Sequence, residues 1–214
     1  MQGDAPAHPA HGSPAGHHAR RDRPRRRCAG RGRQLSARPA TTADLEPLAD
    51  LAARTFPLAA PDDATTESLA QFIEENLSAA RFAEHLADPA CDVLVHDSAS
   101  NKGSIDGYVL LVAGEPDDPD VVAALTIKPT IMLSKFYVAP DAHGQGLADQ
   151  LMVATLAAAE ARGAASLWLG VNQENARAQR FYARQGFDQV GTKRFQVGDR
   201  LEHDFVLQRA LRRR

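Results

Sequence analysis

The chain has 214 residues, 43% of them hydrophobic and 24% charged, a composition typical of one globular domain with a hydrophobic core. No apolar run approaches the roughly 20 residues that cross a bilayer, and no apolar stretch near the N-terminus is typical of a signal peptide, so we expect a cytosolic protein. Cys28 and Cys91 are too few for a disulfide framework or a four-ligand zinc site, and we expect neither cysteine chemistry nor a metal.

The net charge of −2 conceals two unlike regions. Residues 1–34 contain eight arginines against two aspartates, a net charge of +6, so residues 35–214 carry −8. The first segment lacks leucine, isoleucine, valine and phenylalanine, and it cannot bury enough apolar surface to offset the entropy lost on ordering. We therefore expect a disordered tail over residues 1–34 and one folded domain over residues 35–214.

Three interpretations of the tail stay open. The run RRDRPRRR is typical of an arm that binds nucleic acid, and His8, His11, His17 and His18 resemble a metal-binding tract. Alternatively, the segment is an extension without function that results from a start site placed too far upstream. The composition favours this last interpretation, because charged disordered runs carry no fixed geometry.

Three short helices are predicted before the main sheet. A brief strand in LSARPA precedes TTADLEPLADLAARTF, where Leu45, Leu48, Leu51 and Phe56 share one helical face. The segments TTESLAQFIEENL and SAARFAEHLADP have the same character, and Pro89 ends the last helix.

Strands then follow in close succession at residues 91–97, 104–113 and 131–138, separated by polar turns. A glycine-containing loop leads into a helix that ends near residue 162. A strand at 166–171, a helix at 175–187 and strands near 189–196 and 202–208 complete the chain. This order predicts an α+β fold with a mixed, mostly antiparallel sheet, flanking helices and one strand–helix–strand unit.

The loop YVAPDAHGQGLA joins the strand and the helix of that unit. Free N–H groups at a helix start form an anion site, and Gly144, Gly146 and the small Ala148 let a diphosphate approach the backbone. A tight turn without a ligand would also use glycine. The loop lacks the Lys-Ser/Thr ending of a nucleotide phosphate-binding loop, and no acidic ribose partner of a dinucleotide fold follows it.

Two spaced motifs in this part of the chain resemble those of the GNAT (Gcn5-related) N-acetyltransferases. HGQGLA matches the acetyl-CoA loop of that family, Q/R-x-x-G-x-G/A, and the segment from Asn175 to Phe187 matches N-x-x-A-x-x-F/Y-Y-x-x-x-G-F. The closing GTKRFQVGDRLEHDFVLQRAL, together with WLGV, looks most like the PaiA-type spermine/spermidine acetyltransferase branch. The resemblance covers most of residues 36–211.

The resemblance implies an acyltransferase that moves the acetyl group of acetyl-CoA to an amine by direct attack in a ternary complex. It implies that Tyr182 protonates the leaving thiolate, although this ring could instead only pack in the core, and that Asn175 binds the pantetheine arm, caps a helix, or does both. The residues that it implies around acetyl-CoA are Phe136, Tyr137, Val138, His143, Gly144, Gln145, Gly146, Leu147, Ala148, Asn175 and Ala178.

Two positions depart from the family pattern. His143 stands where the family usually has Gln or Arg, so a partly protonated imidazole would replace a permanent charge and make the affinity for acetyl-CoA depend on pH. Asn172 and Gln173 replace the aromatic–acidic pair of the PaiA-type branch, which leaves the acceptor side of the site undetermined.

Acetyl transfer requires a base, because an alkyl ammonium must lose a proton before it attacks. The carboxylate candidates are Glu67, Glu74, Glu75 and Glu202, none of which the sequence places in the cleft. The acidic domain favours a polyamine such as spermidine or spermine, or another small amine, as acceptor. An acetyltransferase for protein amines and an acetyl-CoA-binding module without activity stay open as alternatives, as does a homodimer.

Overall fold

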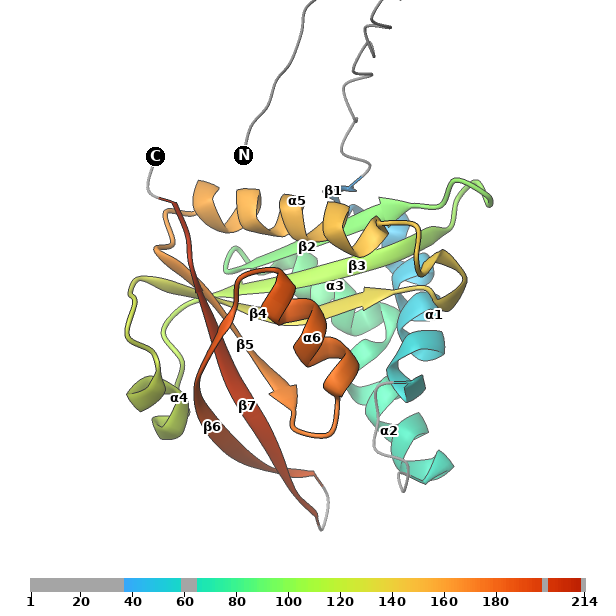
Figure 1. The fold of residues 1–214 in the computed structure, drawn as a ribbon. Coiled ribbons are helices and arrows are strands. Elements are labelled where there is room, and N and C mark those ends of the chain that lie inside the picture. The colour runs from blue at the N-terminus through green and yellow to red at the C-terminus, as the bar shows by residue number, and fades with distance from the viewer. Residues whose placement is uncertain (1–36, 59–64, 198–199, 213–214) are drawn as a thin grey trace, which may run out of the picture. The chain divides into compact units, whose positions relative to one another are not determined.

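A seven-stranded mixed sheet is the centre of this computed structural model, which describes residues 37–58, 65–197 and 200–212, with the backbone alone at 195–197 and 200–202 (Figure 1). The strand order is β1-β2-β3-β4-β5-β7-β6, and only β4 and β5 are parallel neighbours. The strands are β1 (Ala37–Pro39), β2 (Cys91–Asp97), β3 (Ile105–Ala113), β4 (Thr130–Val138), β5 (Ser166–Asn172), β6 (Asp188–Val197) and β7 (Arg200–Ala210).

Helices cover both faces of this sheet. They are α1 (Leu45–Thr55), α2 (Thr66–Leu77), α3 (Ala79–Ala87), α4 (Pro119–Ala124), α5 (Leu147–Ala161) and α6 (Ala176–Arg184), with short 3-10 turns at Thr42–Asp44, Phe56–Leu58 and Pro140–Ala142. In Figure 1, α5 and α6 lie on the viewer's side of the sheet and α3 lies behind it.

Neighbouring residues of β3 show which helix covers which face. Tyr108 packs edge-on against Phe82 of α3, with ring centroids 5.4 Å apart. Gly107 lies so close to α5 that a Cβ on it would be 2.6 Å from Cδ1 of Leu151. Because successive side chains of a strand point to opposite faces, α3 and α5 cover opposite sides, and the main hydrophobic core fills both layers.

The parallel pairing between β4 and β5 is short. Only Thr130–Met132 pair with Ser166–Trp168, whereas β4 pairs with β3 and β5 pairs with β7 over nearly their full lengths. The two strands therefore separate beyond Met132 and Trp168. The edge of β4 from Leu133 to Val138 that faces β5 has no strand partner in the described sheet.

Buried polar side chains hold the point where the two strands separate. The hydroxyl of Ser166 donates to the carbonyl of Ile127 at 2.6 Å and accepts from Nε2 of Gln208 at 2.9 Å. Gln208 Nε2 also donates to the carbonyl of Ile127, at 2.9 Å. Since these groups satisfy one another, the buried polar atoms stabilise the junction of β4, β5 and β7.

The predicted α+β class and the single strand–helix–strand unit are confirmed, and most element boundaries agree within a few residues. Helix α4 differs, because the sequence indicated only a polar turn there. Asp118 caps this helix by accepting from the backbone N–H groups of Asp120 and Val121, at 2.9 and 3.4 Å, and Val121 is fully buried. A helix of six residues is too short to show a helical period in the sequence.

Two further sequence predictions concern the N-terminal tail and membrane-spanning helices. The disordered tail over residues 1–34 falls outside the described residues. In the described part of the chain, no helix is long and apolar enough to cross a membrane.

Candidate active site

The separation of β4 and β5 adjoins a hollow of about 530 Å³. The end of α1, the end of β4, the loop after β4, the first turn of α5 and one side of α6 form its walls. The lining residues are Thr55, Leu58, Phe136, Tyr137, Val138, Ala142, His143, Gly144, Gly146, Leu147, Ala148, Asp149, Asn175, Arg177, Ala178, Arg180, Phe181, Tyr182 and Arg184. The two sequence motifs, about thirty residues apart, therefore line one hollow.

The loop glycines adopt a backbone that other residues rarely adopt. Gly144 has φ +79° and Gly146 has φ +77°, and Gly146 is the N-cap of α5. A Cβ built on either residue would meet no chain atom within 4 Å. The left-handed backbone explains the choice of glycine, and the open space outside it lets an anion approach the free N–H groups of the first turn.

The polar side chains of this loop fold back onto the loop itself. The carbonyl of Val138 lies 3.2 Å from Nε2 of His143, so this nitrogen carries the proton and donates it. Nε2 of Gln145 donates to the carbonyl of Asp141 at 3.0 Å, and Gln145 is not among the lining residues. The backbone N–H groups, rather than these side chains, are thus the part of the loop that is open to an anion.

Asn175 caps α6 and also lines the hollow. Its side-chain oxygen accepts from the backbone N–H of Ala178 at 3.0 Å. The helix-cap interpretation is therefore confirmed, and the side-chain NH₂ group is the donor that Asn175 can offer to a ligand.

Tyr182 projects from α6 among aromatic rings beside the unpaired edge of β4. Its ring centroid lies 5.4 Å from that of Phe181, 5.5 Å from that of Phe187 and 6.4 Å from that of Phe136. Burial, with a smaller contribution from Tyr137, raises the pKa of the Tyr182 hydroxyl well above its usual value. The hydroxyl therefore keeps its proton at neutral pH and can donate a hydrogen bond into the hollow.

Three arginines of α6 line the hollow and were missed in the sequence analysis. Arg177, Arg180 and Arg184 are exposed, lie on one side of the helix and form no ion pair with any described residue. Among the described residues that line the hollow, Asp149 is the single acidic one. The spacing of three and four residues in NARAQRFYAR was the available signal, and the resulting positive charge suits a ligand with several phosphate groups.

Residues of β4 divide between the two faces of the sheet. The ring of Phe136 packs against that of Phe181 of α6, with centroids 5.4 Å apart, so Phe136 faces the hollow. Tyr137 stacks on Tyr108 at 5.5 Å on the side of α3, and burial raises the pKa of Tyr137 to about 12. Of the predicted acetyl-CoA residues, all except Gln145 line the hollow, and their binding role stays a prediction.

The carboxylates considered as a base are not brought to the hollow. Glu67, Glu74 and Glu75 lie exposed on α2, and none of them lines it. The side chain of Glu202 falls outside the described residues. Among the described side chains, no group of three or more His, Cys, Asp or Glu could hold a metal ion.

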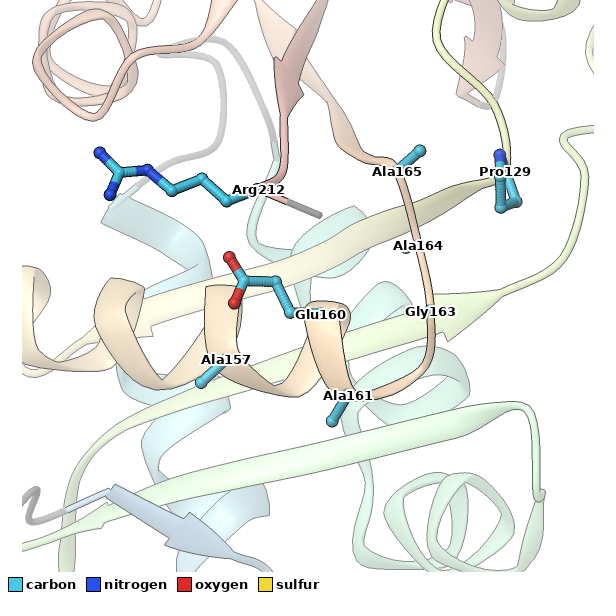
Figure 2. Close-up of a pocket in the computed structure, with 8 residues that line it drawn as sticks. All are labelled: Pro129, Ala157, Glu160, Ala161, Gly163, Ala164, Ala165 and Arg212. Carbon is cyan, nitrogen blue, oxygen red and sulfur yellow. The ribbon is translucent and has the colours of Figure 1, made fainter. Parts of the chain in front are cut away.

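A second hollow, of about 540 Å³, lies at the other end of α5 (Figure 2). Pro129, Ala157, Ala161 and the turn after α5 line it, and Glu160 and Arg212 are its charged lining residues. Neither sequence motif contributes to it. Its volume is similar to that of the first hollow, but it lacks the loop glycines and Tyr182.

Comparison with known proteins agrees with this geometry. The sequence profile of the Acetyltransferase (GNAT) family matches residues 45–187. An uncharacterized N-acetyltransferase of Mycobacterium tuberculosis is 47% identical over 168 residues, which cover 78% of this chain and 98% of that protein. A [ribosomal protein bS18]-alanine N-acetyltransferase of Haemophilus ducreyi is 35% identical over 77 residues, 34% of this chain and 53% of that protein.

Solved structures have the same fold. The PaiA N-acetyltransferase from Thermoplasma acidophilum in complex with coenzyme A has a TM-score of 0.63 at 16% identity, with 81% of this chain and 97% of that chain covered. The ribosomal-protein-S18-alanine N-acetyltransferase from Escherichia coli has a TM-score of 0.56 at 19% identity, with 82% and 92% covered. At these identities the likeness shows the fold alone, so the PaiA-type branch stays a prediction.

The fold and the site define an acyl-CoA N-acyltransferase. Strands β4 and β5 separate after a short parallel pairing, the glycine loop lies at the start of α5, and Tyr182 of the next helix lines the same hollow. The chain belongs to the GNAT acetyltransferase family, and acetyl-CoA is therefore its co-substrate.

Proposed function

We propose that the protein transfers the acetyl group of acetyl-CoA to a primary amine by direct attack in a ternary complex. The position of Tyr182 carries this proposal, because it lines the same hollow as the glycine loop and the unpaired edge of β4. A module that only bound acetyl-CoA would need the loop but would have no use for a proton donor at this point.

Each part of the hollow has a chemical role in this proposal. The free N–H groups at the start of α5 bind the diphosphate, and the arginines of α6 add positive charge beside it. A backbone N–H of the β4 edge near Val138 stabilises the negative charge that develops on the carbonyl oxygen. Tyr182 gives its proton to the sulfur as it leaves.

We assign the acceptor to small amines, with polyamines such as spermidine and spermine first. Residues 35–214 carry a net charge of −8, and α2 presents the exposed Glu67, Glu74 and Glu75. Helix α2 packs beside the hollow, because the ring of Phe72 stacks on that of Phe56 with centroids 4.4 Å apart. Thr55 and Leu58, on either side of Phe56 in the sequence, line the hollow. An acidic surface at this side concentrates amines that carry several charges.

A protein amine is the second candidate acceptor. The observation that favours it is the match to the [ribosomal protein bS18]-alanine N-acetyltransferase, 35% identical over 77 residues. A terminal alanine amine carries one charge, so an acidic surface gives it less advantage than it gives a polyamine.

An amine panel tests both candidates. The full chain is incubated with acetyl-CoA and spermidine, spermine, propylamine or an alanine-terminated peptide, and the release of free thiol is measured. We expect the highest kcat/KM with a polyamine. A higher value with the peptide would transfer the assignment to protein amines, and bound acetyl-CoA without thiol release with any amine would contradict the enzymatic proposal.

A further inference from the structure

A glycine in β5 leaves room for two charged side chains of neighbouring strands. A Cβ built on Gly170 would lie 2.8 Å from Oδ2 of Asp204 in β7 and 2.8 Å from Cε of Lys193 in β6. Asp204 is 8% exposed, and Asp204 and Lys193 each take part in an interaction within the chain. The carboxylate of Asp204 therefore lies directly against the bare backbone of β5.

Strand register places Asp204 on the face of the sheet opposite α6. Trp168, Gly170 and Asn172 share one face of β5, and Asn172 is the register partner of Asp204. Trp168 packs with residues of α4 and is in register with Met132 of β4. Asp204 thus belongs to the face of the sheet that α4 covers.

The same face continues across β4 toward α3. Met132 pairs with Val112 of β3. Val112 and Tyr108 are separated by an even number of residues along β3, so they point to the same face, and Tyr108 packs on α3. Phe136 and α6 lie on the other face. The carboxylate of Asp204 and the glycine loop therefore lie on opposite sides of the sheet.

Gly170 also borders the separation of β4 and β5. It lies two residues beyond Trp168, which is the last residue of β5 that pairs with β4. A larger residue here would fill the space beside Asp204. The glycine instead leaves a buried carboxylate beside β5, just beyond the last residue of β5 that pairs with β4.

We propose that Asp204 receives the acceptor ammonium from this face and takes its proton, a role that rests on the proposed acetyl transfer. One N–H bond of the ammonium breaks, its proton passes to the carboxylate, and the freed electron pair forms a bond to the acetyl carbonyl carbon. The C–S bond then breaks, and the sulfur takes the proton of Tyr182. A second N–H proton restores Tyr182 through solvent, and Asp204 releases its proton to water.

Two lysines are charged groups that share this face with Asp204. Lys193 flanks Gly170 from β6, and Lys135 of β4 is half-buried and forms no ion pair with a described residue. Burial and the nearby Arg81 lower the pKa of Lys135. Positive charge on either lysine favours the ionised form of a carboxylate, which is the form that accepts a proton.

The test compares acceptors that need the base with acceptors that do not. Propylamine is protonated at pH 7 and must lose a proton before attack, whereas methoxyamine is already neutral. For Asp204→Asn we expect kcat/KM with propylamine to fall about 100-fold and kcat/KM with methoxyamine to change less than about threefold. The Kd of acetyl-CoA, measured by calorimetry, stays within about twofold, because its loop lies on the other face.

Gly170→Ala is a second variant that keeps the carboxylate but adds a methyl group against it. We expect the same selective loss, at about tenfold, since displacing a catalytic group is costly even when its chemistry is intact. Asp188→Asn, at an exposed carboxylate of β6, is the matched control and should keep both rates within about twofold.

Three results would overturn the assignment. Equal loss with both amines in an Asp204→Asn protein that still binds acetyl-CoA would assign Asp204 a structural role. An unchanged rate with propylamine would remove it from the reaction. Thiol release by the unaltered protein with no amine would instead defeat the proposed function, and this inference with it.

Discussion

The two faces of the sheet at the β4–β5 separation are built in different ways. On the face of α6, the loop with Gly144 and Gly146 and the helix with Asn175 and Tyr182 are each continuous in the sequence. On the opposite face, β4, β5, β6 and β7 each contribute single residues through strand register. The first face can be recognised from local motifs, whereas the second exists only in the assembled sheet.

The two faces differ in what they would recognise, because binding of acyl-CoA can rely on backbone groups whereas recognition of the acceptor amine relies on side chains. Backbone N–H groups and a helix start bind any acyl-CoA, so they require little beyond glycine and a cap. Recognition of one acceptor amine requires particular side chains at particular register positions.

The largest effect is expected for Gly146→Glu. A side chain in the left-handed region costs about 1–2 kcal/mol, and the new carboxylate would repel the diphosphate, so the Kd of acetyl-CoA should rise about 1,000-fold by calorimetry. Gly163→Glu is the matched control, because Gly163 has φ +76° and open surroundings but lies at the other end of α5. If both variants bind acetyl-CoA equally well, the loop does not bind the diphosphate.

The next effect concerns the proton donor on the same face. Tyr182→Phe keeps the ring packing and removes the hydroxyl, so kcat should fall about 100-fold while the Kd of acetyl-CoA changes little. Tyr108→Phe is the control, because the buried Tyr108 hydroxyl has no hydrogen-bond partner among the described residues and its loss should leave kcat unchanged. A fall in thermal stability without a fall in kcat would instead indicate a packing role for Tyr182.

A smaller effect is expected for the arginines of α6. Arg180→Gln should raise the KM of acetyl-CoA about threefold to tenfold at low salt, and less at high salt, because an exposed charge is screened. Arg81→Gln changes an exposed arginine of α3 on the opposite face and should leave this KM unchanged. Equal effects of the two substitutions would show that only net charge matters, and not the face that carries it.

The smallest effect concerns the acceptor. The KM of spermidine should rise severalfold between low and physiological ionic strength, whereas the KM of propylamine should rise much less, because a multiply charged amine gains more from an acidic surface. Steady-state kinetics at two salt concentrations measure both values. Equal salt dependence would contradict a focused acidic field and weaken the polyamine assignment.

Local patterns were sufficient for most of the fold and for the two motifs that line one hollow, whose binding role stays a prediction. Periodicity and turn residues located the long helices and strands, and the glycine loop and Asn175 lie where the motifs predicted. Helix α4 was missed, since its cap and its one fully buried residue give no period. Asp204 was missed for another reason, because its closeness to Gly170 depends on the pairing of β5 with β7.

From Leu133 to Val138, β4 pairs with β3 on one side, whereas its side toward β5 has no strand partner in the described sheet. This side of β4 is therefore a strand edge inside the sheet. Exposed strand edges are templates for pairing with other chains, and proteins usually cover or charge them. Here the aromatic side chains of Phe181 and Tyr182 pack on Phe136 and cover this edge from one side. The docking of α6 thus covers a strand edge of the described sheet and also places Tyr182 beside it, so the same contacts limit pairing with other chains and hold the proposed proton donor.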